Sequence, residues 1–68
     1  MTVIGVLGAG QLGRMLALAG YPLGLRFAFF DENAEAPAGH LGELTVASWD
    51  DRVALDAFAE AVDLVTYE

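Results

Sequence analysis

The chain has 68 residues, of which 56% are hydrophobic, and it carries ten acidic side chains against three arginines, for a net charge of −7. This balance argues against nucleic-acid binding, which needs clustered Lys and Arg, and the absence of lysine excludes a Walker A loop. The absence of cysteine excludes disulfides and thiolate metal sites and fits a reducing cytoplasm. No apolar run is long enough to span a membrane, so no membrane partner is expected.

The first predicted elements are a strand, a glycine turn and a helix. The apolar segment from roughly Thr2 to Leu7 predicts the strand, the G-x-G-x-x-G pattern from Gly8 to Gly13 predicts the turn, and a helix is expected from about Gln11 to Ala19. In this order, the unpaired N–H groups of the helix's first turn face an anion. The pattern therefore predicts a backbone site for a nucleotide or a phosphosugar.

The residues of the turn have distinct expected roles. Gly8 permits the tight turn, Gly10 lets a ligand approach the backbone, and Gly13 lets the helix pack close to the strand. Gln11 offers an amide donor and acceptor from the first helical turn, whereas the side chain of Leu12 is expected in the core. These five residues form the predicted substrate-binding part of the turn.

The buried face of this helix is predicted from its apolar spacing. Leu12, Met15, Leu16 and Ala19 follow the i, i+3, i+4, i+7 pattern of one buried stripe. Gly20 follows them and is expected to end the helix.

The rest of the chain alternates strands with helical or loop segments. The expected elements are a strand from Leu25 to Phe30, a loop from Asp31 to Gly42 with one short helical turn after Pro37, a strand from Glu43 to Ala47, a helix capped by Ser48 or Asp50 and ending near Ala61, and a strand from Asp63 to Tyr67. The side chains of Trp49 and Tyr67 are expected in the core.

This alternation predicts an α/β fold: the Rossmann-like half of a doubly wound parallel sheet, with strand order 3-2-1-4 and a single domain over residues 1–68. Ligands bind such sheets beyond the carboxyl ends of the strands, where Asp31 and Glu68 lie. Asp31 is either a ribose contact or an ordinary turn acid, and Glu68 is expected to accept hydrogen bonds from a ligand. A corner filled by the chain's own side chains, with no room left for a ligand, would count against an enzyme assignment.

Four segments together resemble the N5-carboxyaminoimidazole ribonucleotide synthases, a family of ATP-grasp ligases of purine biosynthesis. They are Gly8-Ala9-Gly10-Gln11-Leu12-Gly13-Arg14-Met15, the stretch from Asp31 through Ala36-Pro37-Ala38, Ser48-Trp49-Asp50-Asp51, and Val65-Thr66-Tyr67-Glu68. The resemblance runs the length of the chain, and it implies that the chain is the N-terminal, pre-ATP-grasp part of a longer cytoplasmic enzyme.

The resemblance implies an enzyme that uses ATP, bicarbonate and 5-aminoimidazole ribonucleotide, and that acts as a homodimer. Gln11, Leu12 and Glu68 would contact the ribonucleotide, whereas ATP and Mg²⁺ would bind outside these 68 residues. No catalytic or metal-ligating residue is predicted in the chain, and the chain alone is expected to be inactive. Two alternatives stay open: an NAD-binding Rossmann half-domain, and an interaction fragment that binds no small molecule.

Overall fold

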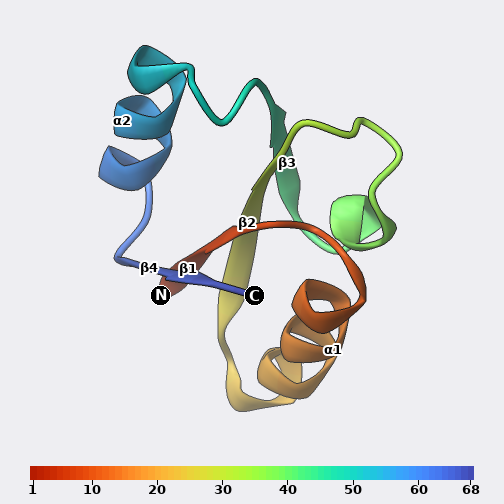
Figure 1. Cartoon of the computed structure of the whole chain (residues 1–68). Helices are drawn as coiled ribbons and strands as arrows, with labels where there is room; N and C mark the ends of the chain where they lie inside the picture. Colours follow the sequence, from red (N-terminus) through yellow and green to blue (C-terminus); the bar gives the residue numbers. More distant parts are fainter.

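The computed structural model describes residues 1–68 as a four-stranded sheet flanked by helices (Figure 1). The strands are all parallel in the order β3-β2-β1-β4, which confirms the predicted fold class and strand order. The elements are β1 (Val3–Leu7), α1 (Gln11–Gly20), the 3-10 helix η1 (Tyr21–Leu23), β2 (Arg26–Asp31), the 3-10 helix η2 (Pro37–His40), β3 (Glu43–Val46), α2 (Arg52–Glu60) and β4 (Leu64–Tyr67).

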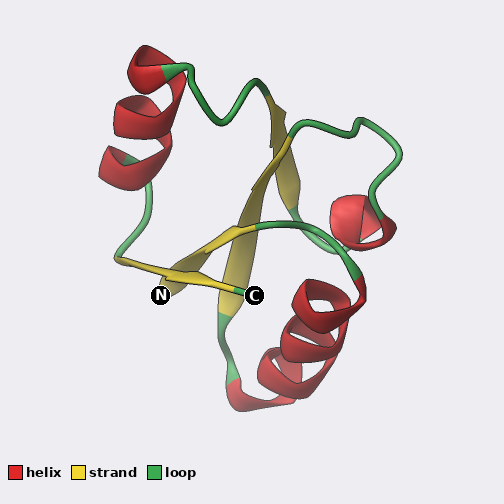
Figure 2. Cartoon of the chain, in the orientation of Figure 1, coloured by secondary structure: helices red, strands yellow, loops and turns green.

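The two α-helices lie on opposite faces of the sheet (Figures 1 and 2). The chain moves outward from β1 to β2 and β3 through α1 and η2, and then returns through α2 to β4 on the other side of β1. Right-handed crossovers that run in opposite directions from β1 place their helices on opposite faces. In sheets of this kind, the place where the strand order reverses, here the carboxyl ends of β1 and β4, is where ligands bind.

The helix α1 packs on the sheet through small residues, and the predicted buried face was wrong. Its buried residues are Gly13, Ala17 and Gly20, whereas Leu12 is 63% and Met15 60% exposed. An added Cβ at Gly20 would overlap the ring of Phe27, so the helix approaches the sheet more closely than a larger side chain permits.

Phenylalanines of β2 form the core on both faces of the sheet. Phe27 and Phe29 are stacked with ring centroids 6.4 Å apart, and both belong to the cluster beneath α1. Phe30 points to the other face, where its ring lies 5.6 Å from that of Phe58 on α2 and 5.2 Å from that of Trp49. Alternation along one strand therefore supplies aromatic side chains to both layers.

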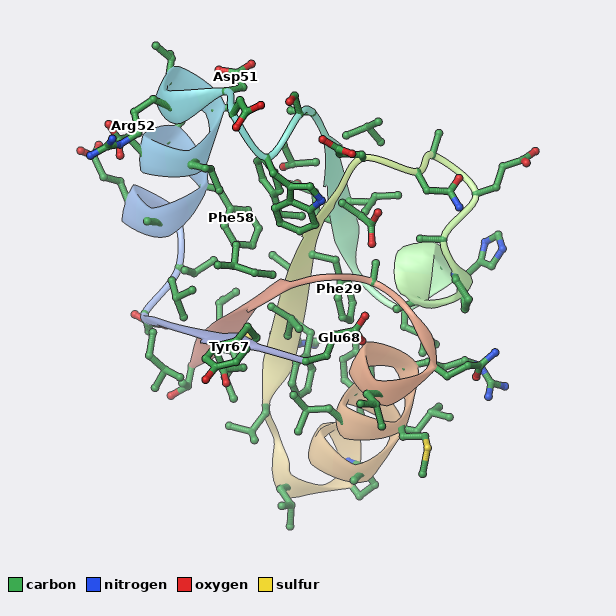
Figure 3. The ribbon with its side chains drawn as sticks, viewed as in Figure 1. Phe29, Asp51, Arg52, Phe58, Tyr67 and Glu68 are labelled. Carbon is green, nitrogen blue, oxygen red and sulfur yellow. The ribbon has the colours of Figure 1, made fainter.

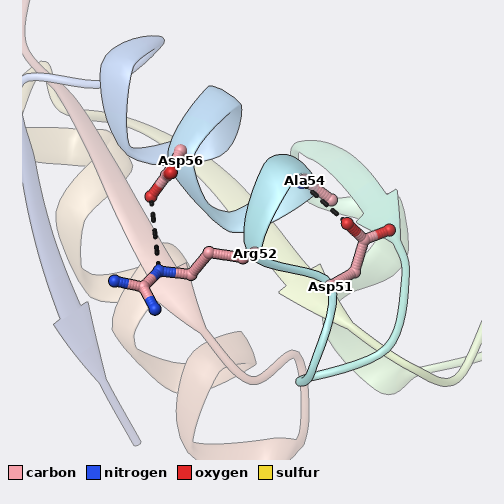
Figure 4. A network of polar contacts seen from close by, with 4 residues as sticks. All are labelled: Asp51, Arg52, Ala54 and Asp56. Atoms are coloured by element: carbon pink, nitrogen blue, oxygen red, sulfur yellow. Dashed lines mark hydrogen bonds and ion pairs between the residues drawn. The ribbon is translucent and has the colours of Figure 1, made fainter.

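The N-cap of α2 is Asp51 rather than the predicted Ser48 or Asp50. The Asp51 carboxylate accepts a hydrogen bond from the Ala54 N–H at 3.0 Å (Figure 4). The Ser48 hydroxyl instead accepts from the Asp50 N–H, which makes it part of the preceding turn. The i, i+3 geometry at Asp51 satisfies one of the free donors of the first helical turn.

Two aromatic residues expected in the core are exposed. Tyr67 lies on β4, an edge strand, and is 80% exposed, and Trp49 is 42% exposed although its ring contacts Phe30. Neither α-helix has the length and hydropathy that a membrane-spanning helix requires.

Candidate functional site

The glycine turn lies at the carboxyl end of β1, where the sequence predicts it. Gly8 adopts a left-handed φ of 108° and donates its N–H to the carbonyl of Phe30 on β2 at 2.7 Å. Gly10 is the N-cap residue of α1 and has no side chain with which to cap it. The free N–H groups of the first helical turn therefore need a partner from elsewhere.

That partner is the carboxylate of Glu68. Its Oε1 accepts a hydrogen bond from the Gly10 N–H at 3.0 Å, and its Oε2 accepts one from the Gly13 N–H at 2.6 Å. Figure 3 shows the side chain extending from the end of β4 toward the start of α1. A negative charge in this position is favoured by two charge-assisted hydrogen bonds and by the positive end of the helix dipole.

The three motif glycines make room for this carboxylate. A Cβ added to Gly8 would lie 2.7 Å from Glu68 Cγ, and one added to Gly10 would lie 2.7 Å from Glu68 Oε1. A Cβ at Gly13 would lie 3.1 Å from Glu68 Oε2 and 3.1 Å from the carbonyl oxygen of Gly8. In this structure the close approach that glycine permits is therefore the approach of Glu68.

Asp31 supports the same turn from the other side. Its Oδ2 accepts a hydrogen bond from the Ala9 N–H at 2.8 Å, and its Oδ1 accepts from the Asn33 N–H at 3.0 Å. Because β1 lies between β2 and β4, an acid at the end of each neighbouring strand reaches the turn. Each oxygen of Asp31 thus already has one backbone donor, so the carboxylate stabilises the turn whether or not it also contacts a ribose.

Two further predicted residues lie on the first turn of α1. Gln11 is exposed, and so is Leu12, in contrast to the expectation that its side chain belongs to the core. Both are adjacent in sequence to the N–H donors that hold Glu68. The structure thus brings the predicted substrate-binding residues together at one corner of the sheet. The predicted set comprises Gly8, Gly10, Gln11, Leu12, Gly13, Asp31 and Glu68.

The chemistry of this corner differs from the open anion site that the motif predicts. The Glu68 carboxylate takes two of the backbone donors, so a phosphate at the same place would meet a negative charge. Each carboxylate oxygen has a second lone pair, which stays available to a donor. The corner is therefore suited to a hydroxyl or an amine that donates hydrogen bonds to a firmly oriented acceptor.

No group of three His, Cys, Asp or Glu side chains is arranged as a metal site in the structure. The two acids at the corner belong to different strands and hydrogen bond to different parts of the glycine turn. A divalent cation usually takes several oxygen ligands at once. The residues present therefore do not fit a Mg²⁺ site.

The residues of the predicted site lie at this corner, but the contact between Glu68 and the glycine turn was not predicted from the sequence. The predicted strand order already indicated this contact, because it placed β4 beside β1 with the carboxyl ends of both strands at the same end of the sheet. An acid one residue beyond β4 is then next to a helix N-terminus that has no capping side chain. Acids at helix N-termini are favoured by the same charge effect as bound anions.

The whole chain, residues 1–68, matches the family model described as "Ribonucleotide synthetase preATP-grasp domain". The chain belongs to this family. The match confirms the resemblance found in the sequence, and it agrees with the parallel sheet and the glycine turn of the structure.

Relatives of known name and their structures are similar over nearly the whole chain. A curated relative from Pseudomonas aeruginosa, N5-carboxyaminoimidazole ribonucleotide synthase, is 57% identical over 65 residues, which are 96% of this chain. The crystal structure of N5-carboxyaminoimidazole ribonucleotide synthetase from Thermus thermophilus superposes with a TM-score of 0.91 at 65% identity over 96% of the chain. The Staphylococcus aureus N5-carboxyaminoimidazole synthetase, complexed with ADP, gives a TM-score of 0.93 at 32% identity over 98%.

In each of these three comparisons the preATP-grasp chain covers 18% of the relative's own length. The similarity therefore concerns one part of those proteins. Their substrates and nucleotide complexes belong to the longer molecules.

Proposed function

We propose that the chain is the N-terminal substrate-binding part of an ATP-dependent ligase. This ligase carboxylates 5-aminoimidazole ribonucleotide with bicarbonate to N5-carboxyaminoimidazole ribonucleotide in purine biosynthesis. The observation that carries the proposal is the family match over residues 1–68, together with the 57% identity to a synthase of this name.

The corner around Glu68 supplies a physical role for the chain in this reaction. Its carboxylate is oriented by the N–H groups of Gly10 and Gly13, and its remaining lone pairs accept hydrogen bonds from hydroxyl or amine groups of the ribonucleotide. Gln11 and Leu12, exposed beside it, supply a polar and an apolar contact to the same ligand. Fixing the substrate in one orientation is a recognised contribution to the rate of a two-substrate reaction.

ATP and Mg²⁺ bind outside these residues in this proposal. The chain has only three arginines and no lysine against ten acids, and it has no cluster of metal ligands. The N–H groups of Gly10 and Gly13 are already bonded to Glu68, so this turn is a poor receptor for a polyphosphate. We therefore expect no ligase turnover from the 68-residue chain.

The same proposal extends to properties of the longer enzyme. It includes bicarbonate as the second substrate, a homodimeric assembly and a cytoplasmic location. These follow from the family resemblance, and the lack of cysteine is compatible with a reducing compartment.

A titration tests the substrate-binding role. The chain is titrated with 5-aminoimidazole ribonucleotide by calorimetry, and the variants Glu68→Gln and Glu60→Gln are compared. Glu60 lies exposed on α2 and serves as the matched control. We expect binding by the wild-type chain and by Glu60→Gln, and a loss of about tenfold in Glu68→Gln. Equal affinities in all three would contradict the proposed role of Glu68.

The two alternatives give different results in the same experiment. An NAD-binding half-domain would bind NADH and lose that binding in Asp31→Ala, because the acid would contact the ribose. NADH also needs the glycine turn for its pyrophosphate, and the N–H groups of Gly10 and Gly13 are already bonded to the Glu68 carboxylate, so we expect no NADH binding. Binding of neither compound would favour an interaction fragment.

A further inference from the structure

A cavity of about 480 Å³ lies between α2 and the sheet, away from the glycine turn. Among its lining residues are Val3, Arg26 and Glu43, which are the first residues of β1, β2 and β3. In a parallel sheet the amino ends of all strands lie at the same end of the sheet. The glycine turn follows β1 at the opposite end, where the carboxyl ends of the strands lie. The cavity is therefore separate from the corner around Glu68.

The cavity arises because small side chains face one another across the two layers. The helix contributes Ala54, Ala57 and Ala61, and the sheet contributes Ala28 opposite them. Phe58 extends from α2 toward the sheet (Figure 3), where it meets Phe30 with the ring centroids 5.6 Å apart. This aromatic contact keeps α2 so far from the sheet that the short alanine side chains leave space between the two layers.

The lining is apolar, and the rim carries two opposite charges. Eight of the eleven lining residues are hydrophobic. Arg26 and Glu43 are both exposed, and neither takes part in the only ion pair of the chain, which joins Arg52 and Asp56. The Arg26 Nε donates to the Met1 sulfur at 3.3 Å, which leaves its other guanidinium donors free.

We propose that this cavity binds a free α-amino acid with an apolar side chain. The side chain fills the apolar space, the carboxylate pairs with Arg26, and the ammonium group pairs with Glu43. The C-terminal end of α2 also favours a positive group near Ala61. A simple anion or a simple cation would satisfy one rim charge and be repelled by the other, whereas a zwitterion satisfies both.

Three compounds with the same aromatic body test the proposal. L-phenylalanine carries both charges, N-acetyl-L-phenylalanine only the carboxylate, and L-phenylalaninamide only the ammonium group. Trp49 reports binding because its ring contacts Phe30, which in turn contacts Phe58 of the cavity wall. We expect saturable binding of L-phenylalanine and affinities about tenfold lower for each analogue. Absence of binding, or equal binding of all three compounds, would overturn the proposal.

Two alanines of α2 provide a matched pair of variants. Ala57 and Ala59 are both exposed on α2, but only Ala57 lines the cavity. We expect Ala57→Leu to abolish L-phenylalanine binding and Ala59→Leu to retain it, with both chains folded by circular dichroism. Binding that survives Ala57→Leu would overturn the proposal. So would a wild-type chain that binds no amino acid but loses a dimer in Ala57→Leu, because a second copy would then be the occupant.

The rim charges are tested separately. Arg26→Gln should weaken N-acetyl-L-phenylalanine binding, and Glu43→Gln should weaken L-phenylalaninamide binding. Each substitution should strengthen binding of the other analogue, because it removes the rim charge that repels that analogue. If neither substitution changes the affinity of any compound, the assignment of a zwitterion is wrong.

Discussion

The Gly13 N–H donates a hydrogen bond of 2.6 Å to the carboxylate of Glu68, which joins the first helix to the end of the last strand. A second bond from Gly10, at 3.0 Å, engages the other oxygen. The anion that this glycine turn binds in the structure belongs to the chain itself. The turn therefore holds and orients an acidic side chain of the same molecule.

We expect Glu68→Gln to lower the free energy of unfolding by about 1–2 kcal/mol, because it removes the charge and turns an N–H₂ group toward a backbone donor. Urea unfolding followed by circular dichroism measures the change. Glu60→Gln, on the exposed face of α2, should change it by less than about 0.5 kcal/mol. Equal effects of the two substitutions would show that the Glu68 bonds do not stabilise the fold.

Gly20→Ala should destabilise the chain by about 1–3 kcal/mol, because the new Cβ overlaps the buried ring of Phe27. Phe27→Leu removes part of that ring. We therefore expect the double variant to be more stable than the sum of the two single effects predicts. Additive effects in thermal unfolding would mean that the cost of Gly20→Ala does not come from the contact with Phe27.

The exposed apolar side chains of α1 should affect association more than stability. Met15→Gln is expected to change the free energy of unfolding by less than about 0.5 kcal/mol, whereas Ala17→Leu, at a fully buried position, should cost about 1–3 kcal/mol. Sedimentation velocity should show less self-association for Met15→Gln than for the wild-type chain. A large loss of stability in Met15→Gln would contradict the observed burial of this helix.

Asp51→Ala should cost about 1 kcal/mol through loss of the α2 cap, and Asp51→Asn should retain most of it. Asp50→Ala, beside it, should have little effect because Asp50 does not cap the helix. Arg52→Ala should also be nearly neutral, since its ion pair with Asp56 is 3.9 Å long and exposed. Differential scanning calorimetry distinguishes the three positions.

The order of elements could be predicted from the sequence because each strand is a short apolar run followed by a turn residue or a capping acid. The buried face of α1 could not. The helix α1 has two apolar faces, and the hydrophobic spacing favours the face with Leu12 and Met15. In the structure the close approach of α1 to Phe27 buries the other face, which carries Ala17 and Gly20. Small residues give a weak hydropathy signal even where the approach is closest.

The site was predicted as a set of residues, but their contacts were not. The strand order identified the edge where Asp31 and Glu68 lie. Whether a carboxylate turns outward to a ligand or inward to a helix N-terminus depends on a side-chain torsion, which spacing along the chain does not determine. For Tyr67 the same limit applies, since burial of a residue on β4 depends on what lies beside that strand.

The bond between Gly13 and Glu68 also orders events during synthesis on the ribosome. The helix that begins at Gln11 emerges early, but its capping carboxylate is among the last of these residues to be translated. Until β4 adds to the edge of β1, the start of that helix lacks its counter-charge and is free to fray. The corner around Glu68 is thus complete only when the nascent polypeptide has paired β1 with β4, its most sequence-distant strands, so this corner forms late in folding.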